Sequence, residues 1–210
     1  MNKYFVNSIG IWADSDRFIK EVLINEEYKY LFRYDTVVDL GCNIGTFSLY
    51  IYPYAQKIYA VEPNPKAINL FRKTIEDNKL DKIIPVECAI TGSDGERFLK
   101  NTEDEHKQYG AGEINDKEGI IVKGIQLNTF MAEYKINYID LLKVDIERNE
   151  KELFDSEGFR NISNKIGTII GEYHIGSIKD SITHNITNAG FRFTDITKGN
   201  SSGKFIARRL

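Results

Sequence analysis

Short apolar runs alternate along the chain with stretches whose apolar residues recur at helical spacing. The runs are rich in β-branched residues and predict strands at residues 36–40, 57–63, 82–90, 138–146 and 165–174. The clearest helical stretch is residues 64–80, where Asn64 can cap the first turn and Pro65 fits inside it. Strands that alternate with helices in this way favour a parallel sheet covered by helices on both faces.

The end of the chain departs from this alternation. Residues 191–196 and 203–210 both look extended, and the segment between them is too short for a helix, so these strands should pair antiparallel. The pattern therefore predicts an α/β fold with a seven-stranded, mostly parallel sheet and one antiparallel strand. Residues 91–118 are polar and predict loops with a short hairpin. Residues 1–35 predict a helical segment that caps the ligand crevice, outside a main domain formed by residues 36–210.

The bulk composition narrows the class of protein. With 210 residues, 41% of them hydrophobic and 28% charged, the chain is large enough for one substantial core. The formal net charge of -3 gives no general attraction for nucleic acid, and no apolar run is long enough to cross a bilayer. The N-terminus lacks a secretion signal, and Cys42 and Cys88 are typical of buried reduced thiols. A cytoplasmic protein is therefore expected.

Two glycines follow the first predicted strand and mark a candidate ligand site. Gly41 and Gly45 let the backbone turn tightly and let a ligand approach it, and Asn43 between them tolerates a positive φ. Glu62 ends the second strand roughly 20 residues later, where a carboxylate can accept hydrogen bonds from ribose hydroxyls. The pattern differs from the G-x-G-x-x-G of nicotinamide enzymes, because Asn43 takes the place of the second glycine. A nicotinamide oxidoreductase is therefore disfavoured.

Acidic side chains also end the fourth and fifth predicted strands. Asp145 and Glu147 are two residues apart and should project to the same side of an extended chain, and so should Glu172 and His174. The carboxyl ends of neighbouring parallel strands meet at one edge of the sheet, where ligands bind in folds of this kind. The sequence therefore places these four side chains at the predicted crevice.

Three stretches carry a resemblance to a known family: VVDLGCNIGTFSL at 37–49, YAVEPNPKAINLFRKTI at 59–75 and IDLLKVDIERNE at 139–150. They resemble the FkbM family of methyltransferases, whose usual motifs read V-D-x-G-A-N-I-G, E-P-x-P and D-L-L-K-x-D-x-E-G. The resemblance implies a class I, Rossmann-like methyltransferase fold with S-adenosyl-L-methionine as cofactor. The cofactor-binding residues that it implies are Asp39, Gly41, Asn43, Gly45, Thr46, Glu62, Pro63, Asn64, Ala89 and Asp145.

The resemblance also assigns roles within this set. Asp39 and the glycine turn would line the methionine and ribose end, and Glu62 would bind the ribose hydroxyls. Ala89 would lie beside the adenine, and Asp145 would face the reactive end of the cofactor.

The same resemblance implies methyl transfer to a hydroxyl of a sugar or another small-molecule acceptor, such as a natural product. The expected partner is therefore a small molecule or saccharide, with no nucleic acid and no membrane span. A hydroxyl acceptor needs a general base. The catalytic candidates are, in order, His174, Glu147, Glu172 and Asp145, with His174 first because an unperturbed imidazole titrates near neutral pH.

Arg148 and Asn149 stand where the family usually has glycine and a small residue. Arg148 could shape the acceptor site, pair with Glu147 or Glu150, or block the site. The last case would leave a non-catalytic module that binds S-adenosylmethionine without turnover. No spacing specific for a metal is present, so no metal site is predicted. The four acid and histidine side chains at the strand ends nevertheless offer ligands, and a metal stays a minority alternative.

Overall fold

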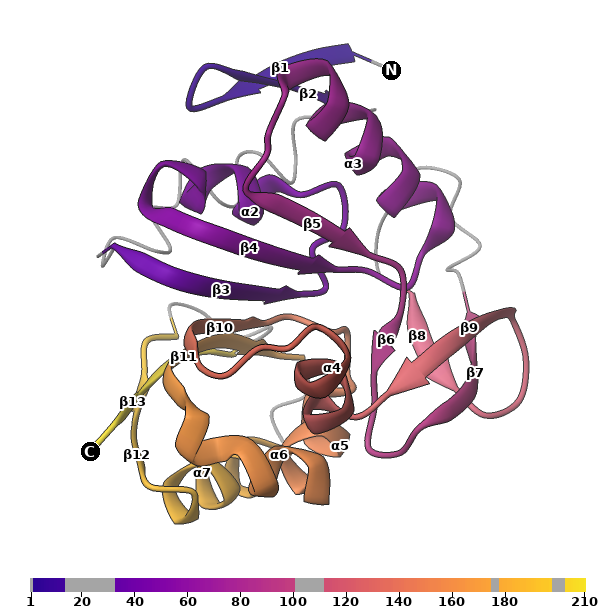
Figure 1. Cartoon of the computed structure of the whole chain (residues 1–210). Coiled ribbons are helices and arrows are strands. Elements are labelled where there is room, and N and C mark those ends of the chain that lie inside the picture. Colours follow the sequence, from indigo (N-terminus) through magenta and orange to yellow (C-terminus); the bar gives the residue numbers. More distant parts are fainter. Residues whose placement is uncertain (1, 14–32, 101–111, 175–177, 198–202) are drawn as a thin grey trace.

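The computed structural model describes residues 2–13, 33–100, 112–174, 178–197 and 203–210. Its centre is a seven-stranded sheet in the order β12-β13-β11-β10-β3-β4-β5 (Figure 1). The strands are β3 (Tyr34–Leu40), β4 (Ala55–Val61), β5 (Ile83–Val86), β10 (Ile139–Val144), β11 (Ile166–Tyr173), β12 (Phe191–Asp195) and β13 (Gly203–Arg209). Only β13 runs antiparallel to its neighbours within this sheet, which confirms the predicted fold.

Helices cover both faces of the sheet, as Figure 1 shows. One face carries α2 (Thr46–Ile51) and α3 (Pro65–Asn78), and the other carries α4 (Leu127–Glu133), α5 (Glu150–Asp155), α6 (Glu157–Ile162) and α7 (Lys179–Asn188). Short 3-10 turns, Tyr52–Tyr54 and Ser163–Lys165, lead into β4 and β11. Two apolar cores result, one on each face of the sheet. None of the described helices is long and apolar enough to span a membrane.

The local signals for α3 act as predicted. The Asn64 side chain accepts a hydrogen bond from the backbone N–H of Lys66, and Pro65 occupies the first turn. The helix ends at Lys79, whose left-handed backbone (φ 53°) stops the helical repeat. Because α3 begins directly after β4, its N-terminus lies at the carboxyl edge of the sheet.

The N-terminal segment differs from the helical cap predicted for residues 1–35. β1 (Asn2–Val6) and β2 (Ile9–Ala13) form an antiparallel hairpin. Asn78 exchanges hydrogen bonds with the backbone of Gly10, and Asn7 donates to the carbonyl of Tyr50, so the hairpin packs near the far ends of α2 and α3. Alternating residues of the hairpin enter the core on that face, a period-two pattern that the sequence reasoning overlooked. Residues 14–32 lie outside the described residues.

The described parts of residues 91–118 contain two strands that pair antiparallel, in agreement with the predicted short hairpin, and these strands belong to a second, four-stranded sheet that was not predicted. It contains β6 (Ala89–Ile90), β7 (Gly95–Lys100), β8 (Glu113–Asn115) and β9 (Ile120–Ile125) in the order β6-β9-β7-β8. The single strand predicted at 82–90 is in fact two, because the chain leaves the central sheet after Val86 and pairs with β9. This sheet buries only a small core around Leu99 and Val122. Polar residues lie among its other positions, and the sequence pattern therefore did not predict it.

Candidate active site

Packing alone requires glycine at two positions of the turn between β3 and α2, whether or not a ligand binds there. Gly41 has a φ of +72°, and a Cβ there would lie 1.8 Å from the carbonyl oxygen of Asp145. Gly45 has a φ of +87°, and a Cβ there would lie 2.1 Å from the Phe71 ring. Asn43 also has a positive φ, 52°, as its residue type predicted. The turn is thus held tightly between the end of β10 and helix α3.

Glu62 joins the glycine turn to the loop after β4. Its side chain is almost fully buried; Oε2 accepts a hydrogen bond of 2.9 Å from the Asn43 backbone N–H, and Oε1 accepts one of 2.8 Å from the Asn64 N–H. Burial raises the pKa of Glu62 to about 7, although these two hydrogen bonds act to lower it. Each oxygen keeps acceptor capacity for a ribose hydroxyl. The geometry therefore suits the role that the sequence assigns to Glu62.

Two buried polar atoms in the same turn lack a hydrogen-bond partner among the described residues: Oδ1 of Asn43 and Oγ1 of Thr46. A buried polar atom without a partner is costly, so such atoms indicate where a polar ligand is accommodated. A nucleoside amino acid offers hydroxyl and amino donors of the required kind. Together with Glu62, these atoms make the turn fit S-adenosylmethionine.

Lys143 is a site residue that the sequence analysis missed. It is buried on β10, with Nζ 3.2 Å from Asp39 Oδ1 and 3.4 Å from Asp145 Oδ2. The ammonium also donates a 2.9 Å hydrogen bond to the Gly41 carbonyl. A lysine within an otherwise apolar strand was the signal that could have revealed it. A buried ammonium needs anionic or carbonyl partners, and such a lysine therefore indicates acidic or carbonyl groups close by.

Asp39 does not have the position that the family resemblance implies. Its side chain is fully buried, pairs with Lys143 and accepts a 2.6 Å hydrogen bond from Ser48 Oγ. It therefore supports the turn from beneath and is not exposed to a ligand. Ala89 is likewise buried, packed with Leu99 and Val122 in the second sheet. Its contact with adenine remains a prediction.

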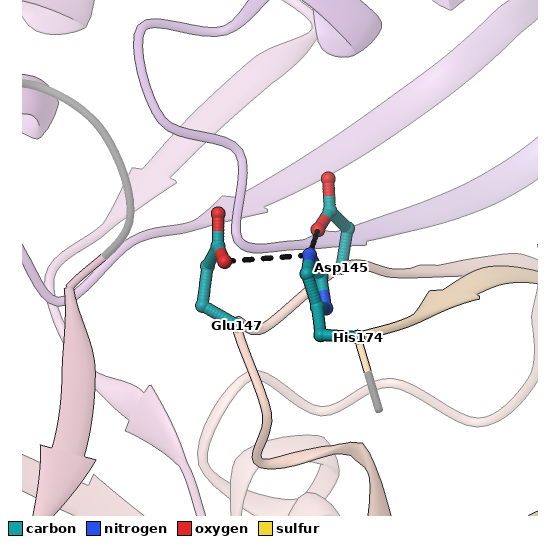
Figure 2. A group of neighbouring side chains, drawn as sticks. All are labelled: Asp145, Glu147 and His174. Carbon is teal, nitrogen blue, oxygen red and sulfur yellow. Dashed lines mark ion pairs between the residues drawn. The ribbon is translucent and has the colours of Figure 1, made fainter. Parts of the chain in front are cut away.

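Asp145, Glu147 and His174 converge at the carboxyl ends of β10 and β11 (Figure 2). His174 Nε2 lies 3.3 Å from Glu147 Oε2 and 3.6 Å from Asp145 Oδ1. On the other side of the ring, Nδ1 is 2.9 Å from Oε1 of Glu150, which is fully buried. The sequence correctly placed the first three side chains together but did not single out Glu150, which looked like an ordinary residue at a helix start.

The reason given for the convergence of Asp145 and Glu147 was wrong. β10 ends at Val144, and Glu147 lies in a turn with a φ of 49°, so strand alternation does not align the two carboxylates. The turn is held instead by Glu150, whose Oε1 accepts hydrogen bonds of 3.3 Å from the backbone N–H groups of both Ile146 and Arg148. Glu150 thereby organises the turn and orients His174.

The surroundings of His174 change the preferred order of general bases. Burial by itself would lower the pKa of His174, but the hydrogen bond to Glu150 and the nearby carboxylates outweigh it and raise this pKa to about 9. An imidazole that is protonated at neutral pH cannot accept a proton. Burial raises the pKa of Glu147, which makes its carboxylate the better acceptor of a proton. Glu172 is not part of the group formed by Asp145, Glu147 and His174, and its Oε2 lies 3.9 Å from Nζ of Lys204 on β13.

Arg148 does not pair with Glu147 or Glu150 through its side chain in the described contacts. Its guanidinium is more than half exposed and lies 3.6 Å from Glu113 on the second sheet. Its backbone is left-handed, with a φ of 79°. A glycine would adopt this conformation without strain, which gives a physical reason for the glycine that the family usually has there.

Replacing Arg148 with glycine should stabilise the protein. Relief of the left-handed strain should raise the free energy of unfolding by about 0.5–1 kcal/mol, since an exposed ion pair such as Arg148–Glu113 contributes little. Urea denaturation measures the change. Arg148→Ala is the matched control, because it removes the same ion pair but keeps the Cβ. A glycine variant no more stable than the alanine variant would contradict the prediction.

Binding of S-adenosylhomocysteine should strengthen as the pH rises toward 7. Ribose hydroxyls donate to the ionised Glu62 carboxylate, and burial raises the pKa of this group to about 7 in the free protein. Below that pH, binding must first release a proton, so the Kd should rise about tenfold for each unit of pH lost. Above it, the affinity should level off. Calorimetry between pH 5.5 and 8 tests this, and Glu62→Gln should bind more weakly but without this dependence.

The chain is similar in sequence to a known methyltransferase family and to curated methyltransferases. Residues 39–193 match the family described as the Methyltransferase FkbM domain. A segment of 101 residues is 37% identical to the tRNA (guanine(37)-N(1))-methyltransferase Trm5b of Methanocaldococcus jannaschii, covering 47% of this chain and 26% of that protein. The chain thus spans about a quarter or less of the length of the curated relatives that it matches.

Solved structures share the fold at low sequence identity. The precorrin-6y C5,15-methyltransferase of Geobacter metallireducens aligns with a TM-score of 0.54 at 10% identity, over 95% of this chain and 98% of that one. TrmK of M. capricolum, in complex with S-adenosyl-homocysteine, aligns with a TM-score of 0.52 at 13% identity, over 89% of this chain and 66% of that one.

The strand order and the match to the family model define a class I methyltransferase with S-adenosylmethionine as cofactor. Within this class, the chain belongs to the FkbM methyltransferase family, whose domain covers most of its length. These findings confirm the fold, family and cofactor that the sequence motifs predicted.

Proposed function

We propose that the protein transfers the methyl group of S-adenosylmethionine to a hydroxyl oxygen of a saccharide or another small-molecule acceptor. The observation that carries this proposal is the convergence of Asp145, Glu147 and His174 beside the glycine turn. A hydroxyl that attacks a carbon must lose its proton, and this cluster supplies carboxylates within reach of such a proton.

Different residues bind the cofactor, accept the proton and orient the proton acceptor. Glu62 and the turn around Asn43 hold the nucleoside, and the bound cofactor supplies a methyl group on a positively charged sulfur. Glu147 accepts the proton of the acceptor hydroxyl. His174, fixed by Glu150, orients the Glu147 carboxylate through the 3.3 Å contact. Alignment of the acceptor against the methyl group contributes much of the rate gain.

Methylation of a nucleic-acid base is a second candidate, and it revises the sequence-based exclusion of nucleic acid. The observation in its favour is the 37% identity of a 101-residue segment to Trm5b, which is named as a tRNA (guanine(37)-N(1))-methyltransferase. A ring nitrogen of guanine also loses a proton on methylation, so the same carboxylate could serve. The acidic cluster and the net charge of -3 argue against a polyanionic acceptor.

A transfer assay separates these candidates. The full chain is incubated with S-adenosylmethionine labelled on its methyl group and with two panels: saccharides and hydroxylated small molecules, and unmodified tRNA transcripts at low and moderate salt. Label should enter a hydroxyl acceptor, and Glu147→Gln should reduce kcat about 10²–10⁴-fold. Glu113→Gln is the matched control and should retain turnover.

Transfer of label to tRNA alone would overturn the hydroxyl proposal in favour of base methylation. Tight binding of S-adenosylhomocysteine without transfer to either panel would favour the non-catalytic module. The position of the Arg148 side chain, paired with Glu113, supports turnover over that alternative.

A further inference from the structure

The three atoms that converge in the active site have the spacing of a metal coordination sphere. The ligand atoms of Asp145, Glu147 and His174 all lie within 4.8 Å of one another. An octahedral divalent ion with bonds of ~2.1 Å places neighbouring ligand atoms ~3 Å apart. The observed distances of 3.3 Å and 3.6 Å from His174 Nε2 to the two carboxylates exceed that by about 0.3 and 0.6 Å, a gap that a small side-chain movement would close.

Glu150 supplies a second, independent observation. Its carboxylate binds Nδ1 of His174, which directs Nε2 toward Asp145 and Glu147. Carboxylates hold the second nitrogen of metal-binding histidines in this way. The other oxygen of Glu150, Oε2, is buried and has no hydrogen-bond partner among the described residues. A buried carboxylate oxygen without a partner is costly, and a nearby cation, or water held by one, would reduce that cost.

The net charge of the cluster also favours a bound cation. Among the described side chains in mutual contact here, the anionic groups are Asp39, Asp145, Glu147 and Glu150, and the cationic groups are Lys143 and His174. Even with His174 protonated, the carboxylates exceed the cations by two charges. A divalent cation would offset most of this excess, leaving one negative charge once His174 Nε2 has lost its proton to bind the ion.

We propose that Asp145, Glu147 and His174 bind a divalent cation through two carboxylate oxygens and Nε2, with the proton on Nε2 released to solvent as the ion binds. The two carboxylate oxygens suit Mn²⁺, whereas the imidazole also suits Fe²⁺ or Zn²⁺, and we use Mn²⁺ as the probe ion. Three protein ligands leave open positions on an octahedral ion, and an acceptor hydroxyl bound there would lose its proton more readily, to the Glu147 oxygen that does not bind the ion. This last step rests on the proposed function, whereas the ion site itself does not.

Titration of the full chain with Mn²⁺ tests the site directly. The protein is treated with EDTA and dialysed, and free Mn²⁺ is followed by electron paramagnetic resonance, with calorimetry as a second measurement. Titrations are run with and without S-adenosylhomocysteine, whose sulfur is uncharged. We expect one saturable site per chain in both cases. Glu147→Gln and His174→Gln should each weaken Mn²⁺ binding at least about tenfold.

Glu113→Gln is the matched control, because Glu113 is a nearby acid outside the cluster, and it should retain the wild-type affinity for Mn²⁺. Absence of saturable binding at millimolar Mn²⁺, or equal weakening by all three variants, would overturn the proposal. Unchanged melting temperatures show that the variants are folded. If S-adenosylhomocysteine binds but Mn²⁺ does not, the metal site fails while the methyltransferase proposal stands. If S-adenosylhomocysteine does not bind, the proposed function fails separately.

Discussion

Replacing Glu62 with alanine should reduce the affinity for S-adenosylhomocysteine by roughly 10²–10⁴-fold. Two hydrogen bonds from ribose hydroxyls to a buried carboxylate are worth about 1.5–3 kcal/mol each, and both are lost. The substitution also leaves the backbone N–H groups of Asn43 and Asn64 without the acceptor that positions them. Calorimetry at pH 8, where Glu62 is ionised, measures the effect.

The control for this experiment is Glu113→Ala, which removes an exposed carboxylate from the second sheet and should leave the affinity within twofold. Circular dichroism must show that Glu62→Ala is folded. An affinity within threefold of wild type would remove Glu62 from the cofactor site. It would leave the carboxylate with the purely structural task of joining the two loops.

The glycine turn and the position of Glu62 beside it could be predicted from the sequence because each of these signals is local. Gly41 and Gly45 follow an apolar strand directly, and Glu62 ends the next one, so strand boundaries alone place them at one edge. The closing strands, joined by too few residues for a helix, similarly fixed the antiparallel β13. In each case the information lies within a few residues of the feature that it specifies.

The acid and histidine cluster was only partly predictable because its properties depend on contacts between distant segments. Glu150 looked like a residue at a helix start until the fold brought it against His174. The pKa of His174 depends on three carboxylates that follow a different strand. The second sheet escaped notice because β7 buries little more than Leu99, a pattern too weak to distinguish from a polar loop.

The cofactor turn and the acid cluster form one unit, which the packing around Gly41 makes clear. The backbone N–H of Asp145 donates to the Leu40 carbonyl, and the Asp145 carbonyl leaves no room for a Cβ on Gly41. Lys143 binds the Gly41 carbonyl and both flanking aspartates, Asp39 and Asp145. A single buried ammonium therefore links the glycine turn after β3 to the end of β10, where the acid cluster begins.

Replacing Lys143 with methionine should lower the free energy of unfolding by about 3–5 kcal/mol, the usual cost of removing one partner from a buried ion pair. Methionine preserves most of the side-chain volume, so the loss reports on charge. Asp39 is fully buried and would keep a negative charge without its cation. Urea denaturation followed by circular dichroism measures the change, and binding of S-adenosylhomocysteine should weaken in parallel as the turn loosens.

A double variant separates the effect of the unpaired charge on stability from the effect of altered packing. Lys143→Met combined with Asp39→Asn removes the stranded charge and should recover a large part of the lost stability, since the two sites are in direct contact and their effects should not add. Lys73→Met, which removes an exposed lysine paired with Asp77 on α3, should change stability by less than about 0.5 kcal/mol. If Lys143→Met proved as harmless as Lys73→Met, the ammonium could not be what holds the glycine turn against the acid cluster.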